Sequence, residues 1–210
     1  SKVLNYPVYL LCGRLLYEFY SQATKRAMRS IRNSASVIKK VYVPKYIYPM
    51  ANVTSNFITF LISLLVLVFV MGYYLIFTDT AMRLTPYIFL SFVPIIILFV
   101  LCVGVGMILC TMEVFFKDVE YMYEVFCMLL FYATPIFYDV ETLRITNKYA
   151  QYALMANPLY SIVSMFRDCV LFGRAMNPNH IIYSAVFSVA MLLIGVLVFY
   201  KKQDDFILHI

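Results

Sequence analysis

Two long stretches without a charged residue restrict what this chain can fold into. They cover residues 50–78 and 84–112. As an α-helix, the first would be about 43 Å long, against about 30 Å for the hydrocarbon core of a bilayer, so it predicts a membrane span that tilts or extends into the cytoplasm. The chain is 63% hydrophobic and only 13% charged, whereas soluble domains have about 25% charged residues. We expect an all-α, polytopic membrane helix bundle with about five spans.

The first predicted span, over residues 6–24, is the least apolar because it carries Arg14 and Glu18. Charged side chains at membrane depth normally face the interior of a bundle or water. These two are four residues apart and can share one helical face, so they indicate either a polar contact that lines a path or an ion pair within the helix, close to the membrane interface. A third interpretation is a helix that lies flat on the membrane, which would invert the orientation of the later spans.

The next segment, residues 21–49, carries seven of the 17 basic residues and no acid. Such a segment stays on the cytoplasmic side, because moving many Lys and Arg residues across a membrane is costly. With this loop inside, the five spans alternate in direction. Within it, residues 30–41 predict a short amphipathic helix with Ile31, Ala35 and Ile38 on one face. This helix is either a docking site for a cytoplasmic partner or part of a basic loop that lies on anionic lipid.

The third predicted span and the loop after it carry two further signals. Gly104 lies in the inner half of the span, where a missing side chain lets another helix approach closely. The loop at residues 113–124 is predicted to be cytoplasmic, with Glu113 and Lys117 at the spacing of a surface ion pair. The apolar stretch that follows, residues 125–138, is short for a crossing unless part of this loop is drawn into the membrane.

Prolines and aromatic residues mark the region before the last span. Residues 134–172 contain short apolar segments interrupted by Pro135 and Pro158, which indicates re-entrant helices that dip in from the outer side and return. The alternative is an outer loop with an interfacial helix. The aromatic residues fit either a path that contacts sugar rings or a belt that anchors the helices at the membrane surface. They are Phe131, Tyr132, Phe137, Tyr138, Tyr149, Tyr152 and Tyr160.

The sequence lacks the short motifs that carry common chemistry. No Gly is followed by Lys, so there is no phosphate-binding loop, and His180 and His209 are isolated. The five cysteines have no metal-ligand spacing and are interpreted as small buried residues. Basic residues are not interleaved with base-stacking aromatics, which argues against a nucleic-acid partner. We expect no catalytic activity, no bound cofactor or metal, and an energy source supplied by a partner protein.

Four blocks of sequence follow one another in order: NSASVIKKVYVPKYIYP at residues 33–49, VFFKDV at 114–119, TPIFY at 134–138, and NPL followed by FRD at 157–168. Together they resemble the ABC-2 type permeases that export polysaccharides such as O-antigen, capsule and teichoic acid. The resemblance covers nearly the whole chain. It implies a six-span subunit with a cytoplasmic start, of which this chain looks as if it lacks an N-terminal amphipathic helix and the first span.

The resemblance also implies partners and roles for individual residues. Residues 30–41 would be a coupling helix that docks on an ATP-binding subunit, and two permeases with two such ATPases would form the transporter in the bacterial cytoplasmic membrane. ATP and Mg²⁺ would bind to the ATPases, and the cargo would be a glycan linked to undecaprenyl diphosphate. The coupling residues would be Ile31, Arg32, Asn33, Ser36, Ile38, Lys39, Lys40, Tyr42 and Pro44. The substrate path would include Arg14, Glu18, Phe131, Tyr132, Phe137, Tyr138, Tyr160 and Arg167.

Two other functions are alternatives on the sequence alone. An ABC-2 permease for a drug or another lipid would share the same fold. A membrane-embedded glycan or lipid enzyme would need clustered acids or histidines at one membrane face, and the sequence offers only Asp139 and Glu141 there.

Overall fold

The structure, a computed structural model, describes residues 6–41, 43–77, 86–136 and 156–206. This part of the chain folds into helices and contains no strand, which confirms the predicted all-α class. Its elements in chain order are α1 (Tyr6–Met28), α2 (Ser30–Asn33), α3 (Ala35–Ile38), α4 (Ile47–Phe77), the 3₁₀ helix η1 (Pro86–Ser91), α5 (Phe92–Phe115), α6 (Val119–Ala133), α8 (Pro158–Val170), α9 (Pro178–Lys202) and the 3₁₀ helix η2 (Gln203–Asp205).

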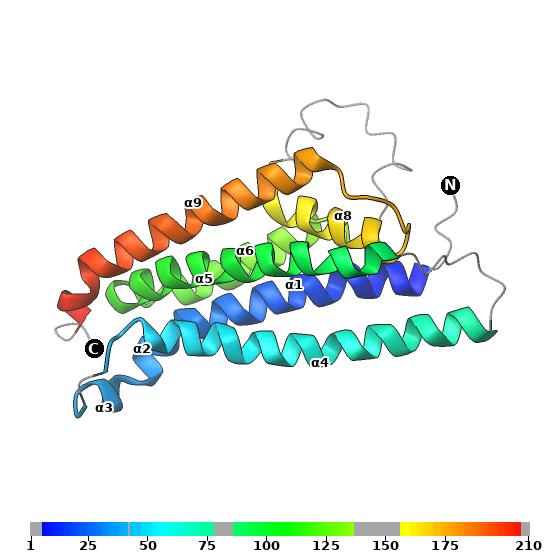
Figure 1. Ribbon diagram of the computed structural model, residues 1–210. Coiled ribbons are helices and arrows are strands. Elements are labelled where there is room, and N and C mark those ends of the chain that lie inside the picture. Colours follow the sequence, from blue (N-terminus) through cyan, green and yellow to red (C-terminus); the bar gives the residue numbers. More distant parts are fainter. Residues whose placement is uncertain (1–5, 42, 78–85, 137–155, 207–210) are drawn as a thin grey trace.

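The long helices α1, α4, α5, α6 and α9 run alongside one another in an elongated bundle (Figure 1). Successive long helices alternate in direction, as the sequence predicts. The short helices α2 and α3 lie at one end together with the end of α9, and α8 lies near the other end (Figure 1). We call the first end the inner end, because it carries the basic segment predicted to be cytoplasmic.

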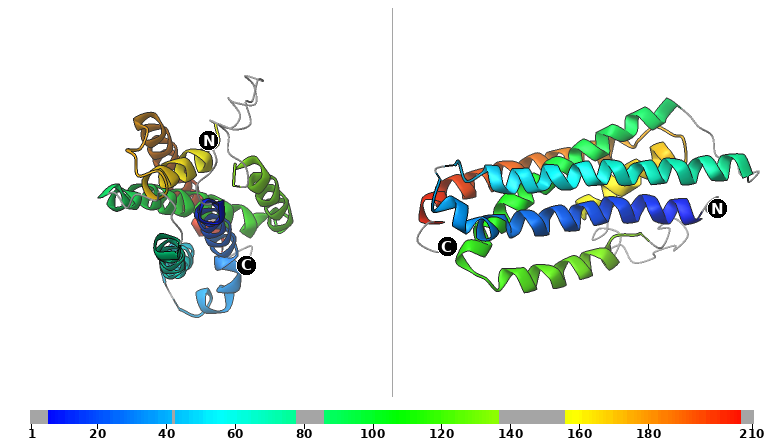
Figure 2. Two further views of the ribbon diagram at one scale, coloured as in Figure 1. Left: turned by 90° about the vertical axis from the view of Figure 1, so that its right-hand side faces the viewer. Right: turned by 90° about the horizontal axis from the view of Figure 1, so that it is seen from below.

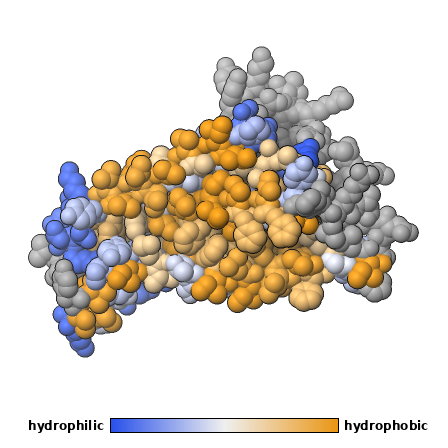
Figure 3. Space-filling view, viewed as in Figure 1, coloured by the Kyte–Doolittle hydropathy of each residue, from blue (hydrophilic) through white to orange (hydrophobic). Residues whose placement is uncertain are grey.

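Three stretches of the described residues are long and apolar enough to cross a membrane: Ile47–Tyr74, Tyr87–Phe115 and Pro178–Asp205. Apolar side chains cover most of the flank of the molecule, and hydrophilic ones gather at the inner end (Figure 3). The chain is therefore a multi-pass membrane protein. The helices α1 and α6 fall outside this set, since α1 carries charges along its length and α6 has only 15 residues. That these two also cross the membrane stays a prediction.

The helices α5 and α9 form the most extensive helix pair, and two glycines lie at their closest approach. A Cβ atom added to Gly104 would lie 2.6 Å from the backbone nitrogen of Leu192, and one added to Gly195 would collide with the carbonyl oxygen of Gly104. Any side chain at either position would push the two backbones apart. The close approach predicted at Gly104 is thus confirmed, and its partner helix is α9.

The helix α1 lies inside the bundle and not across its surface. It packs on α4 and α5, and seen from below it runs between α4 and α6 (Figure 2). Val8, Leu16 and Ala27 are fully buried, so the contact extends from one end of the helix to the other. The interpretation of this segment as a helix flat on the membrane is therefore wrong.

The helix α8 begins where the sequence places a break. Asn157 caps it by accepting a hydrogen bond from the backbone nitrogen of Leu159 at 3.0 Å, and Pro158 occupies the first turn, where its missing N–H costs nothing. The helix is inserted between α9, α5 and α1, and Ile162 and Met165 are fully buried. This agrees with a helix that enters the bundle from the outer end. The preceding residues 137–155 lie outside the described part. For them, the re-entrant structure expected over residues 134–172 stays a prediction.

Candidate functional site

The residues predicted for coupling lie at the inner end, on α2, α3 and the turn after them. The chain forms two four-residue helices there, not one helix over residues 30–41, because it bends at Ser34. Asn33 and Ser34 favour such a bend, since their side chains compete with helical backbone hydrogen bonds. Ile31 is fully buried and fixes α2 to the bundle.

Most of the other predicted coupling residues face outward. Ile38 is half-buried, and Tyr42 lies outside the described residues. Val37 and Val41 are 48% and 55% exposed beside them. The inner end therefore presents a surface that is basic and apolar at once. Its exposed predicted residues are Arg32, Asn33, Ser36, Lys39, Lys40 and Pro44.

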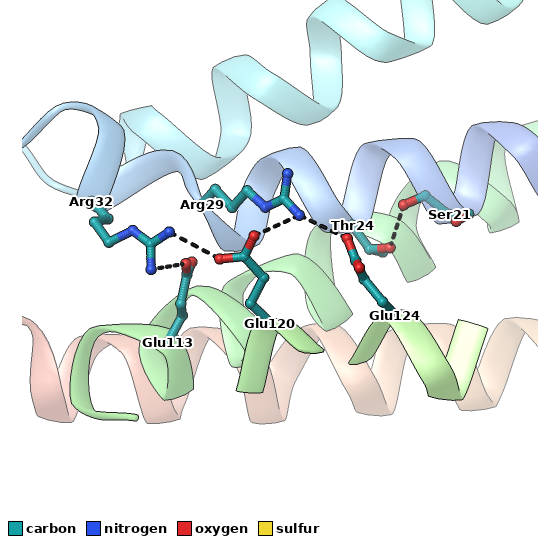
Figure 4. A network of polar contacts seen from close by, with 7 residues as sticks. All are labelled: Ser21, Thr24, Arg29, Arg32, Glu113, Glu120 and Glu124. Atoms are coloured by element: carbon teal, nitrogen blue, oxygen red, sulfur yellow. Dashed lines mark hydrogen bonds and ion pairs between the residues drawn. The ribbon is translucent and has the colours of Figure 1, made fainter. Parts of the chain in front are cut away.

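An ion-pair network joins this segment to α5 and α6 (Figure 4). Arg32 lies 3.1 Å from Oε1 of Glu113 and 2.9 Å from Oε2 of Glu120. Arg29, at the end of α1, lies 2.7 Å from Oε1 of Glu120 and 2.9 Å from Oε1 of Glu124. Glu120 thus bridges both arginines with its two oxygens. A carboxylate held by two guanidinium groups in this way ties three helix ends together more firmly than an isolated surface pair would.

Glu113 differs from the surface residue that its sequence neighbours predict. Its side chain is 1% exposed, and its ion-pair partner is Arg32. The predicted pair with Lys117 is not formed, because α5 ends at Phe115 and the chain turns before α6 begins. The turn brings Glu120 and Glu124 into the first turns of α6, so part of the loop is drawn into the bundle. The sequence predicts that the short apolar stretch at residues 125–138 can cross the membrane only if part of this loop is drawn in with it, and the position of Glu120 and Glu124 on α6 agrees with that.

Polar contacts continue along the seam between α1 and α6. The hydroxyl of Tyr123 donates to Oγ1 of Thr24 at 2.8 Å, and Thr24 in turn donates to the carbonyl oxygen of Tyr20 at 2.7 Å. Nearer the outer end, the hydroxyl of Tyr17 donates to the carbonyl oxygen of Cys127. The helix α6 is therefore fastened to α1 at several levels, and a displacement at the inner end would be carried along both helices.

A second contact links the turn after α3 to the end of α9. The ammonium group of Lys45 donates to the carbonyl oxygen of Gln203 and lies 5.9 Å from the ring centroid of Phe206. Phe206 is fully buried and packs edge-on against Phe115 and Phe199. The inner ends of α5 and α9 are thus joined to the segment predicted for coupling, residues 30–45, as well.

Arg167 is the most deeply placed of the residues predicted for the substrate path. It is 4% exposed, and it donates to the carbonyl oxygens of Pro135 at 2.8 Å, Ile136 at 3.0 Å and Tyr9 at 3.2 Å. Gly13 makes room for it, since a Cβ there would lie 2.5 Å from its Nη2. Arg167 therefore joins α8 to the end of α6 and the outer turns of α1. Its burial and its backbone partners give it a structural role, and that it lines the path stays a prediction.

Arg14 and Glu18 lie on an exposed polar face of α1. This face forms the floor of an open groove of about 500 Å³, with Phe131 of α6 on one side. The two residues do not pair: Glu18 accepts a hydrogen bond from Nε2 of Gln22 at 3.3 Å, and Arg14 has neither a hydrogen-bond nor an ion-pair partner among the described residues. The interpretation as an ion pair within the helix is therefore wrong, and the polar face stays open.

The predicted aromatic path is only partly described. Phe131 is half-buried, and its ring packs 4.9 Å from that of Tyr17. Tyr132 is 62% exposed on the outer flank of α6. Tyr160 lies on α8 and meets the ring of His180 edge-on at 5.9 Å. Phe137 and Tyr138 lie outside the described residues, so the predicted roles of these aromatic residues stay predictions.

Comparison with known proteins points in one direction. The family model described as "ABC-2 type transporter" matches residues 1–171. An O-antigen export system permease protein RfbA of Klebsiella pneumoniae is 26% identical over 208 residues, which cover 98% of this chain and 76% of the relative. The RfbA protein of Myxococcus xanthus is 24% identical over 208 residues, again 98% and 76%. The polysialic acid transport protein KpsM of Escherichia coli is 23% identical over 209 residues, 96% of this chain and 75% of the relative.

Proposed function

The chain belongs to the ABC-2 type transporter family, and on that basis we propose that it is the permease subunit of a polysaccharide exporter in the bacterial cytoplasmic membrane. Relatives aligned over nearly all of this chain carry the names of O-antigen and polysialic acid transport proteins. The subunit provides the membrane spans of the transporter and is not itself catalytic.

One observation carries the proposal: the exposed basic segment at the inner end is bonded to the spans. Lys39 and Lys40 are exposed on the turn after α3. Just before α3 in the chain, Arg32 pairs with Glu113 of α5, and Arg29 and Arg32 both pair with Glu120 of α6. A partner that pushes on α3 would therefore move the inner ends of α1, α5 and α6 together. This is the geometry needed to pass work from a cytoplasmic motor to membrane helices.

The energy source in this proposal is an ATP-binding subunit that docks on α2 and α3 and holds the ATP and Mg²⁺. Two such subunits and two permeases would form the transporter. A second permease copy is supported by the outer flank of α6, where apolar side chains are exposed along the helix, among them Met122, Val125 and Leu129 at 61–71%. The cargo would be a glycan on a polyprenyl diphosphate carrier.

The proposal is tested by reconstituting the chain with its ATPase in inside-out vesicles that contain a labelled lipid-linked glycan. With ATP, the labelled glycan should become protected from an added glycosidase, and with a non-hydrolysable ATP analogue it should stay accessible. A fluorescent hydrophobic drug serves as the competing substrate. Accumulation of the drug together with unprotected glycan would overturn the proposal in favour of a drug permease.

A further inference from the structure

We propose that an apolar groove in the outer half of the bundle holds one acyl chain of a phospholipid from the outer leaflet of the membrane. The groove has a volume of about 400 Å³, and the residues that line it come from α4, η1, the start of α5, and α8. These elements meet near the outer end of the molecule (Figure 1). The site is therefore separate from the polar face of α1, and it does not depend on which substrate the protein exports.

The groove has a buried floor and an exposed rim. Leu67, Ile95 and Phe166 form the floor and are 3%, 4% and 2% exposed. Val68 and Phe92 form the rim and are 64% and 59% exposed. Among the described residues that line the groove, the one with a polar side chain is a serine of η1. A hollow with so few hydrogen-bonding groups does not suit water or an irregular peptide backbone, and it suits hydrocarbon.

The groove lies at the depth of the outer leaflet. Residues 61–72 of α4 line it and belong to the outer half of the candidate span Ile47–Tyr74. Over these residues the helix rises about 17 Å, close to half of a hydrocarbon core of about 30 Å. Tyr73 and Tyr87 stand at the outer mouth and are 59% and 38% exposed, as is typical of tyrosines at a membrane–water interface. A chain that enters beside them and follows α4 would span one leaflet.

Gly72 gives an independent sign of an occupant. Glycine is unfavourable inside a helix, and the other helical glycines have a packing reason for it: a Cβ added to any of them would lie within 3 Å of another residue. At Gly72, no atom of the described residues lies within 4 Å of the added Cβ. The space beside Gly72 is part of the groove, so its missing side chain leaves room for a molecule from outside the chain. The other helical glycines are Gly13, Gly104, Gly106 and Gly195.

The size of the groove distinguishes a lipid chain from a helix of a second copy. An α-helix with its side chains is about 10–12 Å wide, so 17 Å of it would occupy on the order of 1,300 Å³ or more, well above the volume of the groove. A helix would rest on the rim at Val68 and Phe92 and leave the floor empty. An acyl chain can reach the floor and supply the dispersion contacts that an empty hollow forfeits. Because lipid tails are as apolar as the groove, this packing drives occupancy.

The test uses tryptophan fluorescence, since the chain contains no tryptophan of its own. Phe92→Trp places a reporter on the rim, and Phe69→Trp places one at a 78% exposed position of α4 that does not line the groove. Each purified protein, in detergent, is titrated with phosphatidylethanolamine whose acyl chains carry bromine atoms, which quench tryptophan on contact. Phe92→Trp should be quenched at a lipid concentration at least about fivefold below that needed for Phe69→Trp.

Blocking variants are made in the Phe92→Trp protein. Val68→Phe enlarges a rim side chain and should raise the lipid concentration for half-quenching by about fivefold or more. Val66→Phe is the matched control, because Val66 is 57% exposed on the same helix and does not line the groove; it should leave that concentration unchanged. Gly72→Leu fills the groove at its outer mouth and should raise it as Val68→Phe does. Leucine favours helix more than glycine does, so this variant stays folded.

The outcomes separate the possible occupants. Reversal of the quenching by unbrominated phosphatidylethanolamine supports a phospholipid chain, and reversal by undecaprenyl phosphate alone would overturn that assignment in favour of a carrier lipid. Emission from Phe92→Trp that changes with protein concentration and not with brominated lipid would overturn it in favour of a second copy. Equal quenching of Phe92→Trp and Phe69→Trp, or equal effects of Val68→Phe and Val66→Phe, would overturn the site itself.

Discussion

Glu120 lies 2.9 Å from Arg32 and 2.7 Å from Arg29 and so binds the segment predicted for coupling to the first turn of α6. Glu120→Gln should keep the side-chain shape but weaken both contacts. We expect an unfolding free energy lower by about 1–2 kcal/mol, since the cluster is partly exposed, and glycan export reduced by about tenfold at unchanged ATPase binding. Export and ATPase retention are measured on the same vesicles.

Asp118→Asn is the control for this change. Asp118 is exposed two residues earlier, and its side chain does not cap α6. Its substitution removes the same charge and should cost no more than about 0.5 kcal/mol. Equal loss of export in both variants would show that charge near the loop matters and that the bridge between the arginines does not.

Gly195→Ala should separate α5 from α9. The added methyl group would collide with the backbone oxygen of Gly104, which cannot rotate away. We expect the free energy of unfolding to fall by about 2 kcal/mol or more. The control is Gly72→Ala on α4, where an added Cβ has no neighbour within 4 Å. Because Ala favours helix over Gly by about 1 kcal/mol, this variant should be at least as stable as the wild type.

The buried cysteines provide the measurement for stability. Cys12, Cys102, Cys110, Cys127 and Cys169 are all free and buried, so a thiol-reactive dye labels them only as the protein unfolds on heating. Gly195→Ala should lower the labelling midpoint and Gly72→Ala should not. A wild-type midpoint for Gly195→Ala would contradict the close packing of α5 and α9.

Arg167→Lys should destabilise the outer end although it keeps the charge. A lysine ammonium cannot reach the carbonyl oxygens of Pro135 and Tyr9 in one planar fork. We expect the free energy of unfolding to fall by about 2–4 kcal/mol, which would lower the temperature midpoint of cysteine labelling. Arg174→Lys is the matched control, because Arg174 is exposed and pairs with Asp168 at 2.7 Å, a contact that lysine can also make. If both variants unfold at the same temperature, Arg167 does not hold α8 in place.

Labelling from the two sides of the membrane tests the orientation. Lys39→Cys at the inner end should react with a membrane-impermeant thiol reagent in inside-out vesicles and not in intact cells. Asn179→Cys, exposed at the start of α9, should show the opposite pattern. The reverse result for Lys39→Cys would place the coupling segment outside the cell and remove the basis for docking on an ATPase.

Short-range patterns in the sequence predict much of this fold. Uncharged runs locate α4, α5 and α9, Asn157-Pro158 marks the start of α8, and the missing side chain at Gly104 marks a close helix contact. These signals depend on helix periodicity, on backbone hydrogen bonding at proline and on residue size, all of which act within a few residues. The sequence also indicates which segment is basic enough to stay inside.

Contacts between distant residues could not be predicted in the same way. Glu113 pairs with Arg32 across 81 positions of sequence, and its nearer neighbour Lys117 gave the simpler but wrong partner. Arg167 is predicted for a path because charge in a membrane often marks one, and the sequence does not reveal the three backbone carbonyl groups from α1 and the end of α6 that accept its hydrogen bonds. In both cases the decisive partner is set by how the helices pack.

Co-purification of the ATP-binding subunit tests the central claim most directly. In the variant Ile38→Gly, Lys39→Ser, Lys40→Ser, the chain should still insert in the membrane but should no longer retain the ATPase. Lys201→Ser combined with Lys202→Ser, which removes two charges from the same end of the bundle, should retain it as the wild type does. An unchanged amount of ATPase bound to the triple variant would contradict docking on α2 and α3 and the transfer of work through them.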